Sequence, residues 1–246
     1  MLANAAKNMI KTRLAATQVA AAPLNVEWVK PNDSNKLSEI YKLRYQVMVE
    51  DAKKSKRGNP FPEDHYCIKG DEFRDEYDDL DSTGHILIRH KGRAVASTRI
   101  VNGNHVPIEA EKYKWIDVRG KLAPFVKDPN NIAEPSRVVA CRSIRGTNVV
   151  PLMYLHCLDW FMNNNIENFI GMCNTEARPL IEHYSKWAQA KWITDKPFVA
   201  NEFIKGRELD MCFVSVGEAG SKERENMLLT NFAPAFATYS LMKSPK

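Results

Sequence analysis

Residues 149–163 form a run that is apolar on nearly all sides, and this run constrains the fold more than any other feature of the chain. A helix without a polar face has to be buried, so other elements must cover it. A hairpin is predicted where two apolar strands, 85–90 and 94–101, flank the turn pair Lys91-Gly92. The other predicted strands cover 25–29, 136–143, 169–173, 192–199 and 211–216, and the other predicted helices 37–48, 109–114 and 176–188. This order predicts an α/β fold with a mixed, twisted central sheet and helices on both faces.

The domain organisation follows from length and composition. The chain has 246 residues, of which 44% are hydrophobic, and this is enough to bury a sizeable core. We expect one domain over residues 24–246, with a polar loop at 52–76 of the kind that carries function. Residues 1–23 carry Lys7, Lys11 and Arg13 but no acid, and we interpret them as an amphipathic or flexible segment. A peripheral contact with a membrane surface is the alternative for this segment.

Cysteines and apolar runs indicate the compartment. The five cysteines are odd in number, include no CxxC pair and mostly lie in apolar runs, so we expect reduced, buried thiols and a cytoplasmic protein. No stretch approaches the 18 apolar residues that a membrane-spanning helix needs. We expect neither a metal nor a permanently bound cofactor.

Basic residues gather in two places. One run contains Lys53 and Arg57, and a second contains Arg142 and Arg145. These side chains form either a solvated surface or a docking patch for an acidic partner. Nucleic acid is not expected as a partner, because no nucleic-acid-binding motif accompanies the charge.

Four short motifs point to a family. They read Arg44-Tyr45-Gln46-Val47-Met48, Asp75-Glu76-Tyr77-Asp78, Ser97-Thr98-Arg99-Ile100 and Glu134-Pro135-Ser136-Arg137-Val138. In order and spacing they resemble the acyl-homoserine-lactone synthases and their relatives, the long-chain N-acyl amino acid synthases. The resemblance covers roughly residues 35–190 and implies the Gcn5-related N-acetyltransferase (GNAT) fold. The substrate-binding residues that it implies are Arg44, Asp75, Asp78, Arg99, Ser136 and Arg137.

These charged residues also have a simpler interpretation. Arg44 and Arg99 would then pair with Asp75 and Asp78 on the surface, and Arg137 would pair with Glu134 at a strand edge. Under the resemblance, Arg99 or Arg137 supplies a planar fork for the carboxylate of an amino acid.

The expected chemistry is the attack of an amine on a thioester. The amine is protonated at neutral pH, so a general base has to remove a proton, and Glu134 is the candidate. The backbone N–H groups of Val138 and Val139 are candidates for stabilising the tetrahedral oxyanion. Direct transfer needs no covalent acyl-enzyme.

The expected acyl donor is an acyl carrier protein that presents its thioester on 4′-phosphopantetheine. Gly146 is the single glycine after the predicted strand 136–143, whereas a pyrophosphate cradle for coenzyme A is glycine-rich. Carrier proteins are acidic, and the four basic residues Lys53, Arg57, Arg142 and Arg145 are candidates for docking one. The candidates for an acyl pocket are Leu152, Met153, Leu155, Leu158, Phe161 and Met172. Plain core packing explains the same residues.

Two departures separate this chain from the lactone synthases. Met48 stands where their helix carries Phe, and residues 50–64 lack the Trp expected there. Both residues help to form the adenosylmethionine pocket in that family. The chain therefore resembles the N-acyl amino acid synthases more closely, including the N-acyltyrosine synthases, and tyrosine is favoured from this resemblance alone. The alternatives are a lactone synthase that uses S-adenosylmethionine, or a non-catalytic domain that binds an acyl carrier or a lipid.

Overall fold

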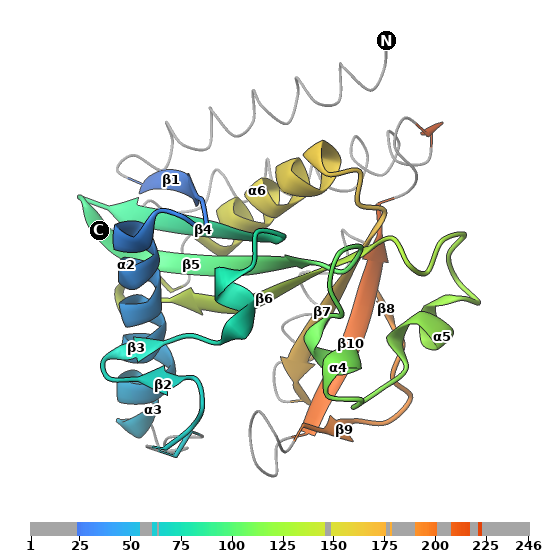
Figure 1. Cartoon of the computed structure of the whole chain (residues 1–246), viewed down its shortest axis with the longest axis horizontal. Coiled ribbons are helices and arrows are strands. Elements are labelled where there is room, and N and C mark those ends of the chain that lie inside the picture. The colour runs from blue at the N-terminus through green and yellow to red at the C-terminus, as the bar shows by residue number, and fades with distance from the viewer. Residues whose placement is uncertain are drawn as a thin grey trace. The chain divides into compact units, whose positions relative to one another are not determined.

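The structure is a computed structural model of the whole chain (Figure 1). It describes residues 24–54, 61–62, 64–145, 149–175, 178, 190–200, 208–216 and 221–222. The N-terminal segment 1–23 and the helix predicted at 176–188 therefore lie outside the described residues, apart from Arg178. The prediction of one domain over residues 24–246 stays a prediction.

A mixed sheet organises the described chain, as the sequence predicts. Its strand order is β1-β4-β5-β6-β7-β10-β8, and β9 pairs with β10 beside that path. The chain divides into two compact units, whose boundaries fall within β5, β6 and α6. Unit 2 contains residues 24–100 and 136–156, and unit 1 contains residues 101–135 and the described residues from Cys157 to Lys222.

Unit 2 is built on antiparallel strands and one long helix. Strand β1 (Leu24–Val29) pairs with β4 (Thr83–His90), which a two-residue turn joins to β5 (Arg93–Asn102). The turn residues Lys91 and Gly92 have φ values of 50° and 79°, in the left-handed region that tight hairpins require. The predicted hairpin is therefore confirmed.

Helix α2 (Ser34–Tyr45) is capped by Asp33, whose carboxylate accepts a hydrogen bond from the N–H of Lys36. Its apolar side packs into a core with β1 and β4. The members of this core cluster are Val29, Leu37, Ile40, Tyr41 and Leu87. The chain continues as a π-helical turn (Gln46–Glu50) and the short helix α3 (Asp51–Lys53).

The polar segment 52–76 has more structure than the predicted loop. It contains a small hairpin of β2 (Ile68–Lys69) and β3 (Glu72–Phe73). Phe61 and Phe73 are buried and pack edge to face, with ring centroids 4.9 Å apart. The prediction of a loop was wrong for this part, because these aromatic residues provide an apolar anchor among the polar ones.

Unit 1 combines short helices with mixed strand pairing. It contains α4 (Glu109–Lys112), α5 (Val118–Leu122), β7 (Asn168–Asn174) and β10 (Glu208–Ser215). Strand β7 runs parallel to the start of β6 (Ile132–Ala140) and antiparallel to β10. The strand predicted at 192–199 is two short strands, β8 (Lys191–Trp192) and β9 (Phe198–Val199), since a turn with Pro197 separates them.

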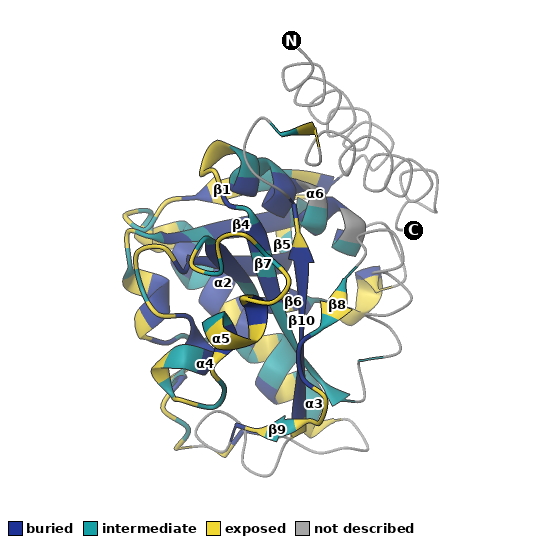
Figure 2. Cartoon of the chain, turned by 90° about the vertical axis from the view of Figure 1, so that its right-hand side faces the viewer, coloured by how far each residue is buried: buried dark blue, intermediate teal, exposed yellow. Residues whose placement is uncertain are grey.

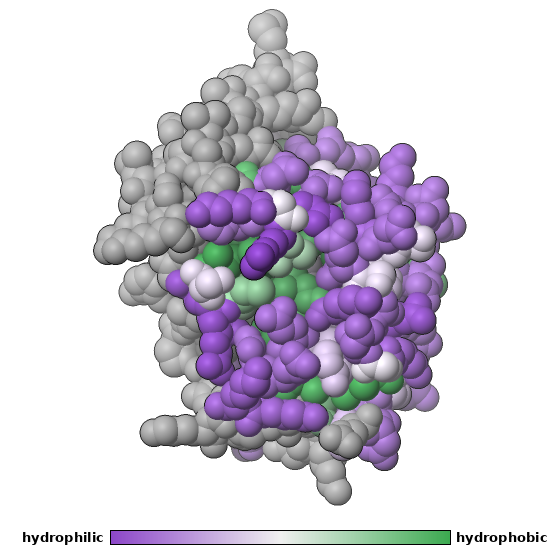
Figure 3. Space-filling view, turned by 90° about the vertical axis from the view of Figure 1, so that its left-hand side faces the viewer, coloured by the Kyte–Doolittle hydropathy of each residue, from purple (hydrophilic) through white to green (hydrophobic). Residues whose placement is uncertain are grey.

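The apolar run 149–163 forms α6 (Val149–Asn163), so the predicted helix is confirmed. A 3₁₀ turn, η3 (Arg142–Ile144), lies between β6 and α6 in the sequence. Figure 2 shows that α6 and the central strands are largely buried, with exposed residues mainly on the short helices and turns. Figure 3 shows a face on which hydrophilic side chains surround a smaller hydrophobic area.

Three of the five cysteines, Cys67, Cys157 and Cys212, are buried, while Cys141 and Cys173 are half-buried. All five are free thiols, and burial raises the pKa of Cys212 to about 12. Among the described residues, no helix combines the length and the apolar character needed to cross a membrane.

Candidate active site

The motif Asp75-Glu76-Tyr77-Asp78 folds into a turn that positions both of its aspartates. Residues Glu76–Asp79 form the 3₁₀ turn η2, and Asp75 caps it by accepting a hydrogen bond from the N–H of Tyr77 at 3.0 Å. Oδ2 of Asp78 accepts in return from the N–H of Asp75 at 2.9 Å. Each carboxylate is thus fixed by the backbone of its own turn.

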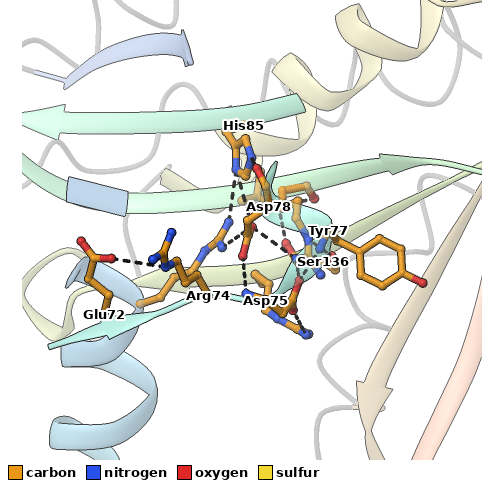
Figure 4. Close-up of polar contacts among 11 residues, drawn as sticks. Glu72, Arg74, Asp75, Tyr77, Asp78, His85 and Ser136 are labelled. Carbon is orange, nitrogen blue, oxygen red and sulfur yellow. Dashed lines mark hydrogen bonds and ion pairs between the residues drawn. The ribbon is translucent and has the colours of Figure 1, made fainter. Parts of the chain in front are cut away.

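Three arginines from three different elements contact these two carboxylates in unit 2. Figure 4 labels both aspartates, together with His85 and Ser136. Arg44 of α2 donates through Nη1 to Oδ1 of Asp78 at 2.7 Å. Arg99 of β5 donates through Nη1 to Oδ1 of Asp75 at 2.5 Å and lies 3.2 Å from Oδ1 of Asp78.

Arg137 of β6 completes this set by donating through Nη2 to Oδ2 of Asp75 at 2.6 Å. Ser136 also joins it, because its hydroxyl accepts from Nε of Arg99 at 3.1 Å. We call this set the Arg-Asp cluster: Arg44, Asp75, Asp78, Arg99, Ser136 and Arg137. All six are the substrate-binding residues that the sequence resemblance implies, and the structure brings them together.

The Arg-Asp cluster is buried, which corrects the simpler interpretation of surface ion pairs. The side chains of Arg44, Arg99 and Asp78 are 0% exposed, and that of Arg137 is 5% exposed. Burial raises the pKa of the Asp75 carboxyl, but Arg99 and Arg137 outweigh it and hold this pKa well below its usual range. Arg44 and Arg99 lower the pKa of Asp78 against burial in the same way. Both carboxylates are therefore ionised at neutral pH. Because three guanidinium groups face these two carboxylates, the cluster as a whole carries a net charge of +1.

His85 supports the Arg-Asp cluster and was missed from the sequence. Its Nε2 lies 3.1 Å from the carbonyl oxygen of Asp78, which only accepts, so Nε2 carries the proton. Nδ1 is then an acceptor, 3.4 Å from Nη2 of Arg44. Burial, reinforced by Arg44, lowers the pKa of His85 to about 4, so the ring is neutral at physiological pH. The available signal was a polar residue at the start of an apolar strand.

Two tyrosine rings also contact the arginines. The guanidinium carbon of Arg44 lies 5.7 Å from the centroid of Tyr41, and that of Arg99 lies 5.4 Å from the centroid of Tyr77. Such cation–π contacts stabilise a buried guanidinium group that is already paired with a carboxylate.

Strand β6 changes its geometry at Arg137. This residue has a φ of 53°, which is unusual for a residue other than glycine and costs of order 1–3 kcal/mol. The next residue, Val138, is 44% exposed, and Val139 is buried. The strand is thus irregular where the sequence predicts oxyanion-stabilising N–H groups. It also begins at Ile132, earlier than the predicted start at 136, so that Glu134 and Pro135 lie inside it.

Glu134 is fully buried and has a structural contact in unit 1. Its Oε2 accepts a hydrogen bond from the N–H of Glu109, the first residue of α4, at 3.0 Å. Arg137 has a carboxylate partner in Asp75, as described above, so Glu134 is not needed to explain its burial. The carboxylate of Glu134 therefore holds α4 against β6, and its role as a base stays a prediction.

The predicted docking residues are partly brought together in unit 2. Arg142 donates through Nη2 to the carbonyl of Asp51 at 3.0 Å, and Lys53 follows two residues later on α3. Lys53, Arg142 and Arg145 are exposed, and Arg145 donates through Nε to the carbonyl of Ala140 at 3.0 Å. Arg57 lies outside the described residues, as does Gly146.

Four of the predicted acyl-pocket residues are buried. Leu152, Met153, Leu158 and Phe161 are at most 2% exposed, and Met172 is partly exposed. The side chain of Leu155 lies outside the description. Phe161 stacks on Phe169 with centroids 5.5 Å apart, which is ordinary core packing. The acyl pocket stays a prediction, because burial alone is also what a plain core requires.

The described residues contain no group of three or more His, Cys, Asp or Glu side chains suited to a metal ion. The contacts described above within the Arg-Asp cluster are ion pairs and hydrogen bonds. The guanidinium group of Arg137 is planar, and the cluster to which it belongs carries a net charge of +1, which suits a carboxylate ligand.

The fold is that of the GNAT-like acyltransferases, as comparison with solved structures shows. The structure of the acyl-homoserine lactone synthase LasI matches with a TM-score of 0.56 and 15% identity, over 83% of this chain and 93% of that one. The CoA-dependent acyl-homoserine lactone synthase MesI matches with a TM-score of 0.59 and 12% identity, over 90% and 98%. FeeM, an N-acyl amino acid synthase from uncultured soil microbes, matches with a TM-score of 0.50 and 10% identity, over 78% and 92%.

At these identities the likeness establishes the fold alone. No protein-family model matches the sequence, and no curated protein matches it.

Proposed function

We propose that this chain is an N-acyltransferase that moves a long-chain fatty acyl group from an acyl carrier protein to the α-amine of an amino acid. Tyrosine is the favoured amino acid. The observation that carries the proposal is the buried Arg-Asp cluster with its net charge of +1, set in a GNAT-like fold. Structures of this fold include lactone synthases and an N-acyl amino acid synthase.

The residual positive charge suits the carboxylate of an amino acid. Arg44 and Arg99 are 0% exposed, whereas Arg137 is 5% exposed and lies at the irregular point of β6. Arg137 is therefore the candidate for receiving the carboxylate. Asp75 holds its guanidinium group in place, and two parallel hydrogen bonds to a carboxylate would fix the orientation of the substrate.

The proposed reaction is a direct aminolysis. Glu134, directly or through a water, takes a proton from the substrate ammonium group, and the amine nitrogen attacks the thioester carbonyl. The N–H groups of Val138 and Val139 stabilise the oxyanion that forms. Collapse of the intermediate breaks the C–S bond and forms the amide. The pantetheine thiolate takes up one proton, and the second proton passes to solvent.

The acyl carrier protein is the proposed donor because it needs no pyrophosphate cradle. The exposed residues Lys53, Arg142 and Arg145 offer positive charge to an acidic carrier. Among the structural neighbours, MesI is described as CoA-dependent, so coenzyme A thioesters are the donor that has to be tested against the carrier.

A lactone synthase that uses S-adenosylmethionine is the second candidate. The likeness to LasI and MesI favours it. The two departures from the lactone synthases, Met48 and the lack of Trp in residues 50–64, are evidence against it. A non-catalytic module that binds an acyl carrier or a lipid is the third.

One experiment separates these candidates. Purified full-length protein is mixed with acyl carrier protein or coenzyme A thioesters of the same chain length, together with single amino acids or S-adenosylmethionine. Thiol release and mass spectrometry of the products are measured. We expect an N-acyl amino acid, formed faster from the carrier. Equal catalytic efficiency with both donors contradicts the donor assignment, an acyl lactone supports the second candidate, and no release with any pair supports the third.

A further inference from the structure

Unit 1 carries a group of hydrophobic side chains that remain partly or largely exposed. Phe125 is 52% exposed and Val199 is 46% exposed. Trp115 stacks near Tyr113 with centroids 5.1 Å apart and reaches Phe198, the neighbour of Val199, at 6.4 Å. These three aromatic residues are only partly buried.

The same contacts join the segment of α4 and α5 to the edge strands β8 and β9. Phe125 lies 5.7 Å from Phe213 of β10, and β8 and β9 both pair with β10. Lys121 of α5 lies 3.9 Å from Asp195 in the turn between β8 and β9. Figure 2 looks onto this part of unit 1, with α4, α5, β8 and β9 turned toward the viewer. We call it the α4–β9 face and define its hydrophobic members as Tyr113, Trp115, Phe125, Phe198 and Val199.

Lysines are interleaved with these rings. Nζ of Lys112 lies 5.5 Å from the centroid of Tyr113, and Nζ of Lys191 lies 5.6 Å from that of Phe125. The exposed lysines of the two segments that build the face are Lys112, Lys114, Lys121, Lys127, Lys191 and Lys196.

The acids of the same segments are mostly engaged in local structure. Glu111 pairs with Arg119 at 2.6 Å, and Asp117 and Asp128 accept hydrogen bonds from the backbone N–H groups of Gly120 and Asn130. Residues 109–128 and 191–199 contain seven basic and five acidic side chains, so the face keeps a positive balance of +2.

We propose that the α4–β9 face docks on an anionic lipid bilayer. Aromatic rings with basic neighbours are the side chains that settle at the headgroup level of a membrane, and lysines are attracted to its negative surface. Phe125 and Val199 would enter the interface, while the lysines would meet lipid phosphates. The proposal concerns unit 1 alone and does not depend on the acyl transfer proposed above.

Co-sedimentation with lipid vesicles tests the proposal directly. The full-length protein is mixed without substrates with vesicles of phosphatidylcholine, or of phosphatidylcholine and phosphatidylglycerol, at low and at high salt. We expect binding to the anionic vesicles only, and weaker binding at high salt because salt screens the attraction. Equal binding to both vesicle types, or no binding to either, overturns the proposal.

Two double variants locate the contact. Lys127→Glu with Lys196→Glu should weaken partitioning more than about tenfold, since each basic residue near the surface contributes about fivefold. Phe125→Ser with Val199→Thr removes apolar contact and should weaken it by about tenfold. The matched controls lie in unit 2, where Lys30→Glu with Arg93→Glu changes the same charge and Trp28→Ser removes another exposed ring.

The variants are compared at equal thermal stability by circular dichroism, so that loss of binding is not loss of fold. Binding that falls in the two face variants and stays in the controls supports the proposal. Binding that is unchanged in both face variants overturns it and assigns the contact to another part of the chain, such as residues 1–23.

Discussion

Arg44 and Asp78 form an ion pair of 2.7 Å between residues 34 positions apart, and neither side chain has any exposed surface. The pair joins α2 to the turn before β4. A buried ion pair stabilises the fold only while both partners are present, because removal of one partner leaves the other charge buried without compensation.

Arg44→Met should therefore destabilise the protein strongly. Methionine fills a similar volume but leaves Asp78 with one cation fewer, and we expect a loss of about 3–5 kcal/mol in the free energy of unfolding. Denaturant titration followed by circular dichroism measures it. Lys42→Met is the matched control on the same helix, because the ion pair of Lys42 with Asp71 is exposed and should be worth less than about 1 kcal/mol. Similar losses in both variants would contradict a special role for burial.

The low pKa of His85 predicts a loss of stability in mild acid. The unfolded histidine binds a proton below its ordinary pKa of 6.5, whereas the folded one resists protonation down to about 4. The unfolded state thus binds more protons between these values, so stability present above pH 6.5 falls as the pH drops toward about 4. The loss is roughly 3 kcal/mol. The low pKa values of Asp75 and Asp78 contribute only at lower pH, where stability is lost as those carboxylates protonate.

His156 titrates in the same window, because burial also lowers its pKa to about 4. His85→Gln and His156→Leu should each flatten part of the stability curve between pH 6.5 and about 4, measured by denaturant titration across pH. His105→Gln, at an exposed position, is the control. A curve that keeps its slope in His85→Gln would show that this ring does not resist protonation in the folded state.

The sequence predicts the elements of the fold better than the energetics of the candidate site. Periodicity and turn residues predict the helix 149–163 and the hairpin at Lys91-Gly92, because both depend on local patterns. The pairing of Arg44 and Arg99 with the two aspartates belongs to the simpler interpretation of the sequence, yet its burial depends on three elements meeting, which no local pattern encodes. His85 was missed because its two hydrogen bonds exist only in the folded cluster. The small hairpin at 68–73 was missed because its strands have two residues each, too few for a periodic pattern, and because Phe73 of β3 packs on Phe61, which lies outside the hairpin.

Charge reversal at Arg145 tests carrier docking. Arg145→Glu should raise the Michaelis constant for acyl carrier protein about tenfold at low salt and less at high salt, while that for the amino acid stays nearly constant. Steady-state kinetics in both substrates measures this. Arg142 is less suitable for this test, because its side chain contacts Asp51. A glutamate at position 142 would repel the carboxylate of Asp51 and change the local structure as well as the surface charge. Arg93→Glu, exposed at the start of β5, is the matched control. An unchanged Michaelis constant for the carrier would remove Arg145 from the docking surface.

Glu134→Gln separates the two roles of Glu134. Glutamine keeps a carbonyl oxygen that accepts the hydrogen bond from the N–H of Glu109, so α4 should stay in place and the protein should remain folded. An amide cannot take a proton, so loss of a general base should slow turnover by ~10²–10⁴-fold while substrate affinity changes less. Higher pH should partly restore the rate, because more of the amine is then already deprotonated.

The structural role gives the opposite pattern of results. If Glu134 serves only to hold α4, Glu134→Gln should turn over at nearly the wild-type rate per folded molecule, and Glu134→Ala should lose stability because the N–H of Glu109 is left buried without its acceptor. Turnover and thermal stability are therefore measured on both variants, with Glu111→Gln, whose carboxylate pairs with Arg119, as the control on α4. Turnover of Glu134→Gln within about threefold of the wild type, against the much larger loss expected for a base, would exclude Glu134 as the proton acceptor.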